Sequence, residues 1–287
     1  MTALVGRLSR TDRVLAGYCA GTALLAAVRG GALGARQWTL AGGHLLVAAL
    51  AIAAAALDRG REGGASRFAH RWLPLVALAW LYGWAGEMRH LIVAADLDPV
   101  IERWDETLFP GHWHEVSARL PAAAVELAHA AYFSYYLILF VPALVVLAAG
   151  ARRAREVDRY LFWLTLAMVA HYALNFLLPV AGPLGDRATL PAGVLFVPLM
   201  NAFYAGFDRG GLAFPSTHVV AAMIAAGFAG RIFFPGRALA YALWFGAIAL
   251  STVVCGYHYP IDVLAGLLSG ALFCGAAGLT ATRAKFR

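Results

Sequence analysis

Long stretches of apolar residues recur along the chain, separated by short segments that hold most of the charged residues. A helix needs about 20 predominantly apolar residues to cross a bilayer, and these stretches approach or exceed that length once their flanks are included. The pattern predicts an all-α polytopic membrane protein. The eight expected spans are residues 14–28, 38–57, 72–86 with an extension to 95, 120–150, 160–179, 216–230, 238–255 and 259–282.

Two further apolar segments are not expected to span the membrane. Pro191 and Pro198 interrupt residues 190–207, which indicates a re-entrant or surface segment buried against the protein. In residues 97–109, apolar side chains recur at helical spacing with acidic residues opposite them. This pattern predicts an amphipathic helix lying flat in the membrane interface, anchored by Trp104 and Trp113.

Composition agrees with a membrane protein, because 61% of the 287 residues are hydrophobic and only 14% are charged. The formal net charge of +7 does not indicate a nucleic-acid partner, since the arginines lie between apolar stretches and form no single patch. The three cysteines, Cys19, Cys255 and Cys274, lie in apolar stretches without metal-ligand spacing. They are therefore expected to be small core residues.

The distribution of arginine predicts an orientation. Placing the N-terminus in the cytoplasm puts most of the 23 basic residues in cytoplasmic connections, as the positive-inside rule favours. Both termini are then cytoplasmic, and the connections before residues 216 and 259 share the outer face. We expect a plasma membrane of bacterial type.

Polar residues stand at the start of the span that opens at residue 216. Pro215 is followed by Ser216 and Thr217, either of which can cap a helix, and the free N–H groups of a helix start favour an anion. His218 falls in the first turn of this expected helix. A charged or titratable group in such a place is costly and needs a reason to be present.

A second polar group opens the last span. His258 and Asp262 are four residues apart, which puts both side chains on one helical face, so that the carboxylate can accept the imidazole N–H. The other ring nitrogen is then free to act as a nucleophile, and His218 could protonate a leaving oxygen. Either histidine alone is more often a satisfied polar residue inside a helix bundle. Together they indicate a site.

Pro-Ser-x-His followed by His-x-x-x-Asp, each opening an apolar span, resembles the type 2 phosphatidic acid phosphatase superfamily of membrane phosphatases and phosphotransferases. FPSTH at 214–218, the pair Ser251 and Thr252, and HYPIDVLAG at 258–266 are most similar to the inositol phosphorylceramide synthase branch, with sphingomyelin synthases as relatives. The resemblance covers roughly residues 95–282. It implies a six-helix core, with His258 as nucleophile, Asp262 orienting it and His218 as acid, and needs no metal or cofactor.

Phosphate binding is expected from the backbone of Ser216 and Thr217 together with an arginine. Superfamily phosphatases carry a Lys and an Arg-Pro pair before the catalytic helix, and a second phosphate-binding Arg where this chain has Thr252. Here the nearby cations are only Arg187 and Arg209. This departure favours a singly charged phosphodiester over a phosphate monoester as the donor.

Other polar residues are secondary candidates. Glu126 and His129, inside the fourth span, belong either to a buried polar network or to the wall of a headgroup pocket. Tyr136 and Tyr257 are further candidates for substrate binding, with ordinary helix packing as the alternative. Glu87, Arg89 and His90 are expected to face one another or a polar cavity. His112, His114 and Glu115 have some metal-ligand character, but an interfacial loop holds such residues without a metal.

The sequence thus predicts N-terminal transmembrane helices over residues 1–95, and an interfacial helix with a catalytic transmembrane core over residues 96–287. The expected reaction transfers a phospho-headgroup, such as a phosphoinositol-type group, from a phospholipid donor to a lipid hydroxyl acceptor through a phosphohistidine. One alternative is a lipid phosphate phosphatase that hydrolyses phosphatidic acid or isoprenoid (pyro)phosphates. Another is a non-catalytic lipid-binding membrane protein.

Overall fold

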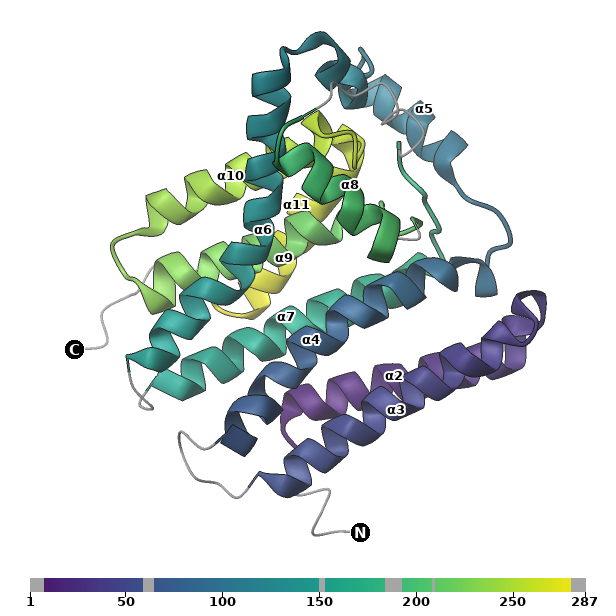
Figure 1. Ribbon diagram of the computed structural model, residues 1–287, viewed down its shortest axis with the longest axis vertical. Helices are drawn as coiled ribbons and strands as arrows, with labels where there is room; N and C mark the ends of the chain where they lie inside the picture. Colours follow the sequence, from purple (N-terminus) through teal and green to yellow (C-terminus); the bar gives the residue numbers. More distant parts are fainter. Residues whose placement is uncertain (1–7, 59–64, 150–152, 184–192, 208–209, 280–287) are drawn as a thin grey trace.

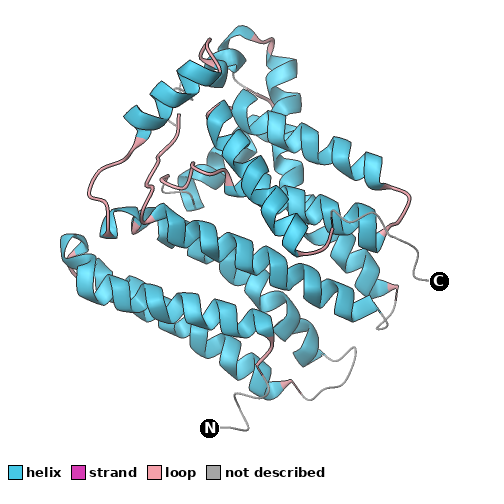
Figure 2. Cartoon of the chain, turned by 180° about the vertical axis from the view of Figure 1, so that it is seen from behind, coloured by secondary structure: helices cyan, strands magenta, loops and turns pink. Residues whose placement is uncertain are grey.

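The computed structural model describes residues 8–58, 65–149, 153–183, 193–207 and 210–279. Within these ranges the chain is helical, and Figure 2 shows helices joined by loops. The α-helices are α2 (Arg10–Arg29), α3 (Arg36–Leu57), α4 (Ala65–Glu87), α5 (Asp98–Leu108), α6 (Ala122–Ala148), α7 (Ala154–Asn175), α8 (Phe196–Phe207), α9 (Thr217–Phe228), α10 (Ala238–Val254) and α11 (Pro260–Ala276).

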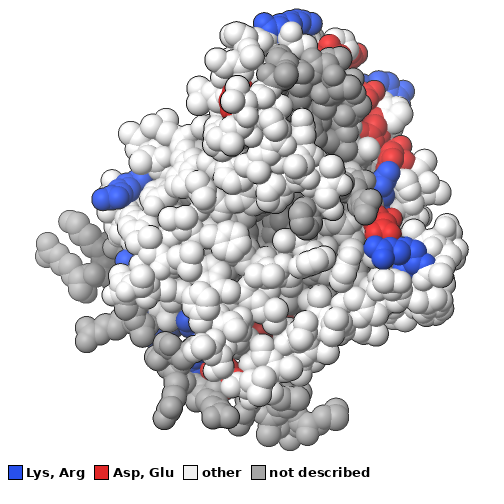
Figure 3. All heavy atoms as spheres, in the orientation of Figure 1, with Lys and Arg blue, Asp and Glu red and all other residues white. Residues whose placement is uncertain are grey.

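Each of the eight expected spans contains a helix of the structure. Among the described residues, Arg10–Leu33, Arg36–Leu57 and Ala122–Ala148 are long and apolar enough to cross a membrane, and the helices of 217–233, 238–254 and 260–276 are shorter and apolar. The fold is therefore consistent with a polytopic integral membrane protein. In Figure 3 the visible face is largely uncharged, with charged side chains along its edges, as expected for a surface in contact with lipid.

Two predicted spans were too long at their ends. The extension to residue 95 is wrong, because α4 ends at Glu87 and a short 3₁₀ turn, Arg89–Leu91, follows. Arg89 turns back there and donates to the carbonyl oxygen of Gly86 at 3.1 Å. The last helix ends at Ala276, since Gly278 has a φ of 69° and reverses the chain, and the Leu279 N–H bonds back to Cys274.

The helices pack side by side, and α9 lies among four of them, α6, α7, α10 and α11. Figure 1 shows α2 beside α3, then α4 beside α7, then α6 with α9, α10 and α11. Nearly all of α9 is buried, and its small residues Ala221, Ala222, Ala225 and Ala226 let the neighbouring helices approach closely. This central helix begins at the proposed catalytic segment, so its packing fixes the position of His218.

The amphipathic segment forms the predicted helix, α5, and its position in the membrane interface stays a prediction. Trp104 and Trp113, the predicted anchors, are 54% and 50% exposed, whereas Asp105 is 3% exposed. Asp98 and Asp105 of α5 turn toward loops of the protein, whose backbone N–H groups need acceptors. The segment with Pro198 forms α8, which packs against α6.

Candidate active site

The two predicted catalytic histidines lie together at one end of α9 and α11. His218 stands in the first turn of α9, and His258 lies in the turn before α11. His218 Nδ1 is 3.5 Å from His258 Nε2, and both side chains are buried. The serine predicted to contribute to phosphate binding is part of the same cluster, because Ser216 Oγ is 3.1 Å from His258 Nε2.

The start of α9 is tied directly to α11. Ser216 caps α9, since its Oγ accepts the N–H of Val219 at 3.4 Å, and its own N–H donates to the carbonyl oxygen of Asp262 at 3.0 Å. Gly266 permits this approach, because a Cβ at that position would lie 2.9 Å from the Ser216 carbonyl oxygen. Two segments about 40 residues apart are thereby fixed relative to each other.

The ring of His258 is oriented by two acceptors. Its Nδ1 lies 3.0 Å from the carbonyl oxygen of Ala213 and 3.3 Å from Asp262 Oδ2. Because both partners are acceptors, Nδ1 carries the proton, and Nε2 keeps its lone pair directed toward Ser216 and His218. Asp262 Oδ2 also accepts the N–H of Tyr259 at 2.9 Å, which holds the carboxylate in place. Sequence reasoning missed Ala213, since a backbone carbonyl leaves no side-chain signal.

A cluster of tyrosines covers the other side of His218. Tyr132 Oη lies 2.9 Å from His218 Nε2 and 2.6 Å from the hydroxyl of Tyr204 on α8. Tyr257 stacks on both tyrosines, with ring centroids 4.3 Å from Tyr132 and 4.5 Å from Tyr204. Tyr257 was predicted as a site residue, whereas Tyr204 was missed because α8 reaches the site only through tertiary packing. Tyr132 can exchange a proton with His218.

The remaining sequence candidates are more dispersed. The Glu126 carboxylate accepts backbone N–H groups of residues 194–197 at 2.5 to 3.3 Å and so caps the start of α8. His129 Nδ1 is 2.8 Å from the carbonyl oxygen of Val125 and 3.4 Å from Cys255 Sγ. Tyr136 lines a cavity that His218 also lines. Arg187 and Arg209 lie outside the described residues.

The polar residues near the end of α4 also have separate partners. Glu87 pairs with Arg36 at 2.7 Å, whereas Arg89 and His90 pair with Asp96 at 2.8 and 2.9 Å. The alternative expectation, that these residues face a polar cavity, stays a prediction. The contacts shown pair their charges with Arg36 and Asp96, as is common at helix ends.

Three acids on one face of α5 hold the loops that carry the site. Asp98 accepts the N–H groups of Ala181 and Gly182 at 2.8 and 2.7 Å. Four and seven residues further on, Glu102 accepts the Tyr259 hydroxyl at 2.7 Å and Asp105 accepts the Ile261 N–H at 2.8 Å. Burial raises the pKa of the Asp105 carboxyl, because removal from water disfavours its charged form. Burying this carboxylate therefore costs free energy. We call Asp98, Glu102 and Asp105 the acidic face of α5.

A comparison with protein families shows to which family the chain belongs. A family model described as the PAP2 superfamily matches residues 100–276, which is more than half of the chain and includes His218, His258 and Asp262. The chain belongs to the PAP2 superfamily. Membership implies a phosphatase or phosphotransferase activity that is metal-independent and acts on phosphate-bearing lipids. Searches of curated proteins and of solved structures give no match to the chain.

The PAP2 match begins within α5 and so includes Asp105. We predict that Asp105 positions the start of α11. Asp105→Ala should lower the turnover rate about 10-fold or more, because the start of α11 loses an acceptor and small misplacements of catalytic groups are costly. Asp105→Asn keeps an acceptor oxygen and should retain most of the rate. Turnover of one donor by purified enzyme measures this.

The matched control for Asp105 is Glu106→Ala on the exposed face of α5, where Glu106 pairs with His112 at 3.1 Å. Thermal unfolding of each variant separates loss of fold from loss of rate. Equal rates for Asp105→Ala and Glu106→Ala would show that the acidic face does not position the site.

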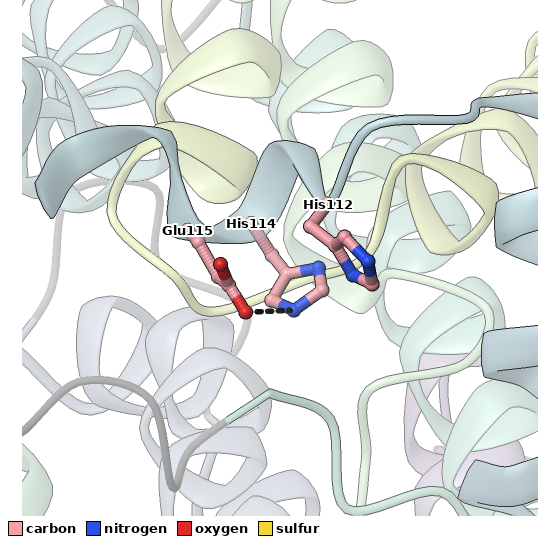
Figure 4. A group of neighbouring side chains, drawn as sticks. All are labelled: His112, His114 and Glu115. Carbon is pink, nitrogen blue, oxygen red and sulfur yellow. Dashed lines mark ion pairs between the residues drawn. The ribbon is translucent and has the colours of Figure 1, made fainter. Parts of the chain in front are cut away.

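A small cluster beside this PAP2 site has ligand atoms suited to a metal ion. His112, His114 and Glu115 place theirs within 4.8 Å of one another, and Figure 4 shows the three side chains together in the segment after α5. The ring of His114 packs edge-on against Tyr259, with centroids 4.9 Å apart. The chemistry predicted for His258 and His218 does not require this cluster.

Proposed function

We propose that this PAP2 protein is a membrane phosphotransferase that moves a phospho-headgroup from a phosphodiester lipid to the hydroxyl of a second lipid. The proposal rests on the charge around His258 Nε2. Among the described residues, Ser216 and His218 approach this nitrogen and Tyr132 approaches His218, so the positive charge that they supply is that of His218 in its protonated form. Such surroundings suit a phosphate that brings a small negative charge.

The number of available cations supports a diester donor. A phosphate monoester carries about −1.5 to −2 charges near neutral pH and a diester carries one, so the monoester needs more compensating positive charge. Arg89 reaches the catalytic segment beside Gly211, but its guanidinium is held by Asp96 at 2.8 and 3.1 Å. Arg187 and Arg209, which lie outside the described residues, remain the candidates for phosphate binding.

The geometry supports a mechanism in two half-reactions. In the first, His258 Nε2 attacks phosphorus, the bond to the leaving lipid oxygen breaks, and that oxygen takes a proton from protonated His218, which becomes neutral. The product is a phosphohistidine that still carries the headgroup. In the second, His218 accepts the proton of an acceptor hydroxyl, whose oxygen forms a new bond to phosphorus as the bond to His258 breaks. Backbone N–H groups at the start of α9 stabilise the charged oxygens.

The similarity of FPSTH and HYPIDVLAG to inositol phosphorylceramide synthases supports a more specific assignment. In that assignment the donor carries a phosphoinositol-type headgroup and the acceptor is a ceramide or a diacylglycerol. The arginine distribution supports a site that opens to the outer face of the membrane. An acceptor in the same leaflet then reaches a higher effective concentration than water-soluble alcohols.

An assay with two donors tests the proposal. Purified protein in mixed micelles receives phosphatidylinositol or phosphatidic acid, each with and without ceramide or diacylglycerol. We expect the diester to be turned over faster, with the headgroup appearing on the acceptor lipid. His258→Ala is the control for contaminating activity. Faster release of inorganic phosphate from phosphatidic acid than turnover of the diester would assign the protein to the phosphatases of its superfamily instead.

A further inference from the structure

An uncharged cavity leads from His218 into the helix bundle. It has a volume of about 240 Å³, lies between α4, α6, α7 and α8, and its lining holds no Lys, Arg, Asp or Glu among the described residues. Tyr82 of α4 lies beside His218, with centroids 6.0 Å apart, and Leu75 lines the cavity two helical turns further along. The cavity therefore runs roughly 10 Å along α4. A lining of this kind favours hydrocarbon over a polar headgroup.

The end of the cavity at the catalytic site is polar. Thr217 and His218 both line it, and Thr217 is only 2% exposed. The Thr217 hydroxyl has no hydrogen-bond partner within the part of the chain that the structure describes. Because a buried hydroxyl without a partner is costly, this group points to a polar atom of a bound molecule. That atom would lie next to the imidazole of His218.

The cavity opens sideways between helices. Ala79 of α4 lines it and is nevertheless exposed, and Phe140 of α6 is partly exposed on the facing side. The Phe140 ring is held by stacking on Trp72, with centroids 6.0 Å apart. A chain in the surrounding lipid can enter through such an opening without passing a charged group. The occupant is therefore expected to come from the membrane.

The wall formed by α4 is not part of the family match. The match covers residues 100–276, whereas Leu75, Leu78, Ala79 and Tyr82 all precede it. The N-terminal helices thus contribute a surface beyond the matched core. Together with Tyr135 and Tyr136 of α6, this surface lines the cavity.

We propose that this cavity binds the hydrocarbon chain of a lipid alcohol whose hydroxyl is placed at Thr217 and His218. If the proposed function holds, on which this step rests, the same cavity holds the leaving alcohol in the first half-reaction and the acceptor alcohol in the second. His218 protonates the leaving oxygen and then takes the proton of the acceptor hydroxyl, so both oxygens must occupy one place. The two alcohols then compete for one cavity.

Photolabelling of the full-length protein tests chain binding separately from catalysis. The probe is a hexadecanol with a diazirine in its chain, used on wild-type protein and on His258→Ala, which keeps the cavity and lacks the nucleophile. In both proteins we expect labelled peptides from α4 and α6, and competition by diacylglycerol. Ala79→Trp fills the opening and should remove most of this labelling. Val76→Trp, on the exposed face of α4, should not.

The hydroxyl contact has its own test. Thr217→Val keeps the shape of the side chain. It should raise the concentration of hexadecanol probe needed for half-maximal labelling about 2- to 10-fold, as expected for one lost hydrogen bond. A matched diazirine alkane without the hydroxyl should bind both proteins equally. Equal labelling of the Ala79→Trp and Val76→Trp proteins, or an equal loss for alcohol and alkane in Thr217→Val, would overturn the proposal. Labelling as expected without headgroup transfer would contradict only the proposed function.

Discussion

Replacing His258 by alanine is expected to abolish turnover of every donor. His258 Nε2 keeps its lone pair because Nδ1 faces only acceptors, and it lies 3.5 Å from His218 Nδ1, which is positioned to serve the leaving oxygen. No phosphohistidine can form without this ring. The matched control is His171→Ala, another buried histidine, which contacts Ala167 and Ser269 in the packing of α7 against α11 and should keep its turnover.

Asp262→Asn should leave slow turnover where His258→Ala leaves none. Loss of the orienting carboxylate in catalytic triads costs about 10²- to 10⁴-fold. Here the Ala213 carbonyl oxygen still accepts the His258 Nδ1 proton, so we expect a loss near the lower end of this range. Turnover of a fixed donor by both variants measures the difference. Normal turnover by His258→Ala would mean that another residue is the nucleophile.

The effect of His218→Ala is expected to depend on the leaving group. With a lipid alcohol as leaving group, loss of the general acid should slow the first half-reaction about 10²- to 10⁴-fold. With a p-nitrophenyl phosphodiester, whose leaving group departs without a proton, the loss should be much smaller. Rates of phosphoenzyme formation from the two donors measure this directly.

Tyr132→Phe is the companion variant for His218. It removes the hydroxyl that lies 2.9 Å from His218 Nε2 while keeping the ring that stacks on Tyr257. We expect a smaller loss than for His218→Ala, because the acid itself remains. An equal loss for both donors in His218→Ala would show that this histidine does not act as the acid.

The sequence could predict the helices and the meeting of His218 with His258 because both depend on local patterns. Apolar stretches mark the spans, and two short motifs at the starts of spans mark the catalytic segments. The four-residue spacing of His258 and Asp262 places them on one face without knowledge of any other element. The structure brings these three residues together, and their catalytic roles remain predictions.

The sequence could not predict contacts between distant segments. Asp105 accepts from Ile261, 156 residues away, and Glu126 accepts from Leu195, 69 residues away. A hydrophobicity pattern assigns such acids to water, whereas here their partners are backbone N–H groups of loops and of a helix start. Tyr204 was missed for the same reason, because α8 reaches Tyr132 only through packing against α6.

Trapping the phosphoenzyme tests the central claim most directly. The protein is mixed with a phospholipid donor labelled at phosphorus, quenched under alkaline conditions that preserve phosphohistidine, and digested for mass spectrometry. We expect the labelled phospho-headgroup on the peptide that contains His258, its disappearance when a lipid acceptor is added, and no label in His258→Ala. Label on Ser216 or Thr217 instead, or turnover with no phosphoenzyme at any time, would contradict a phosphohistidine mechanism at this site.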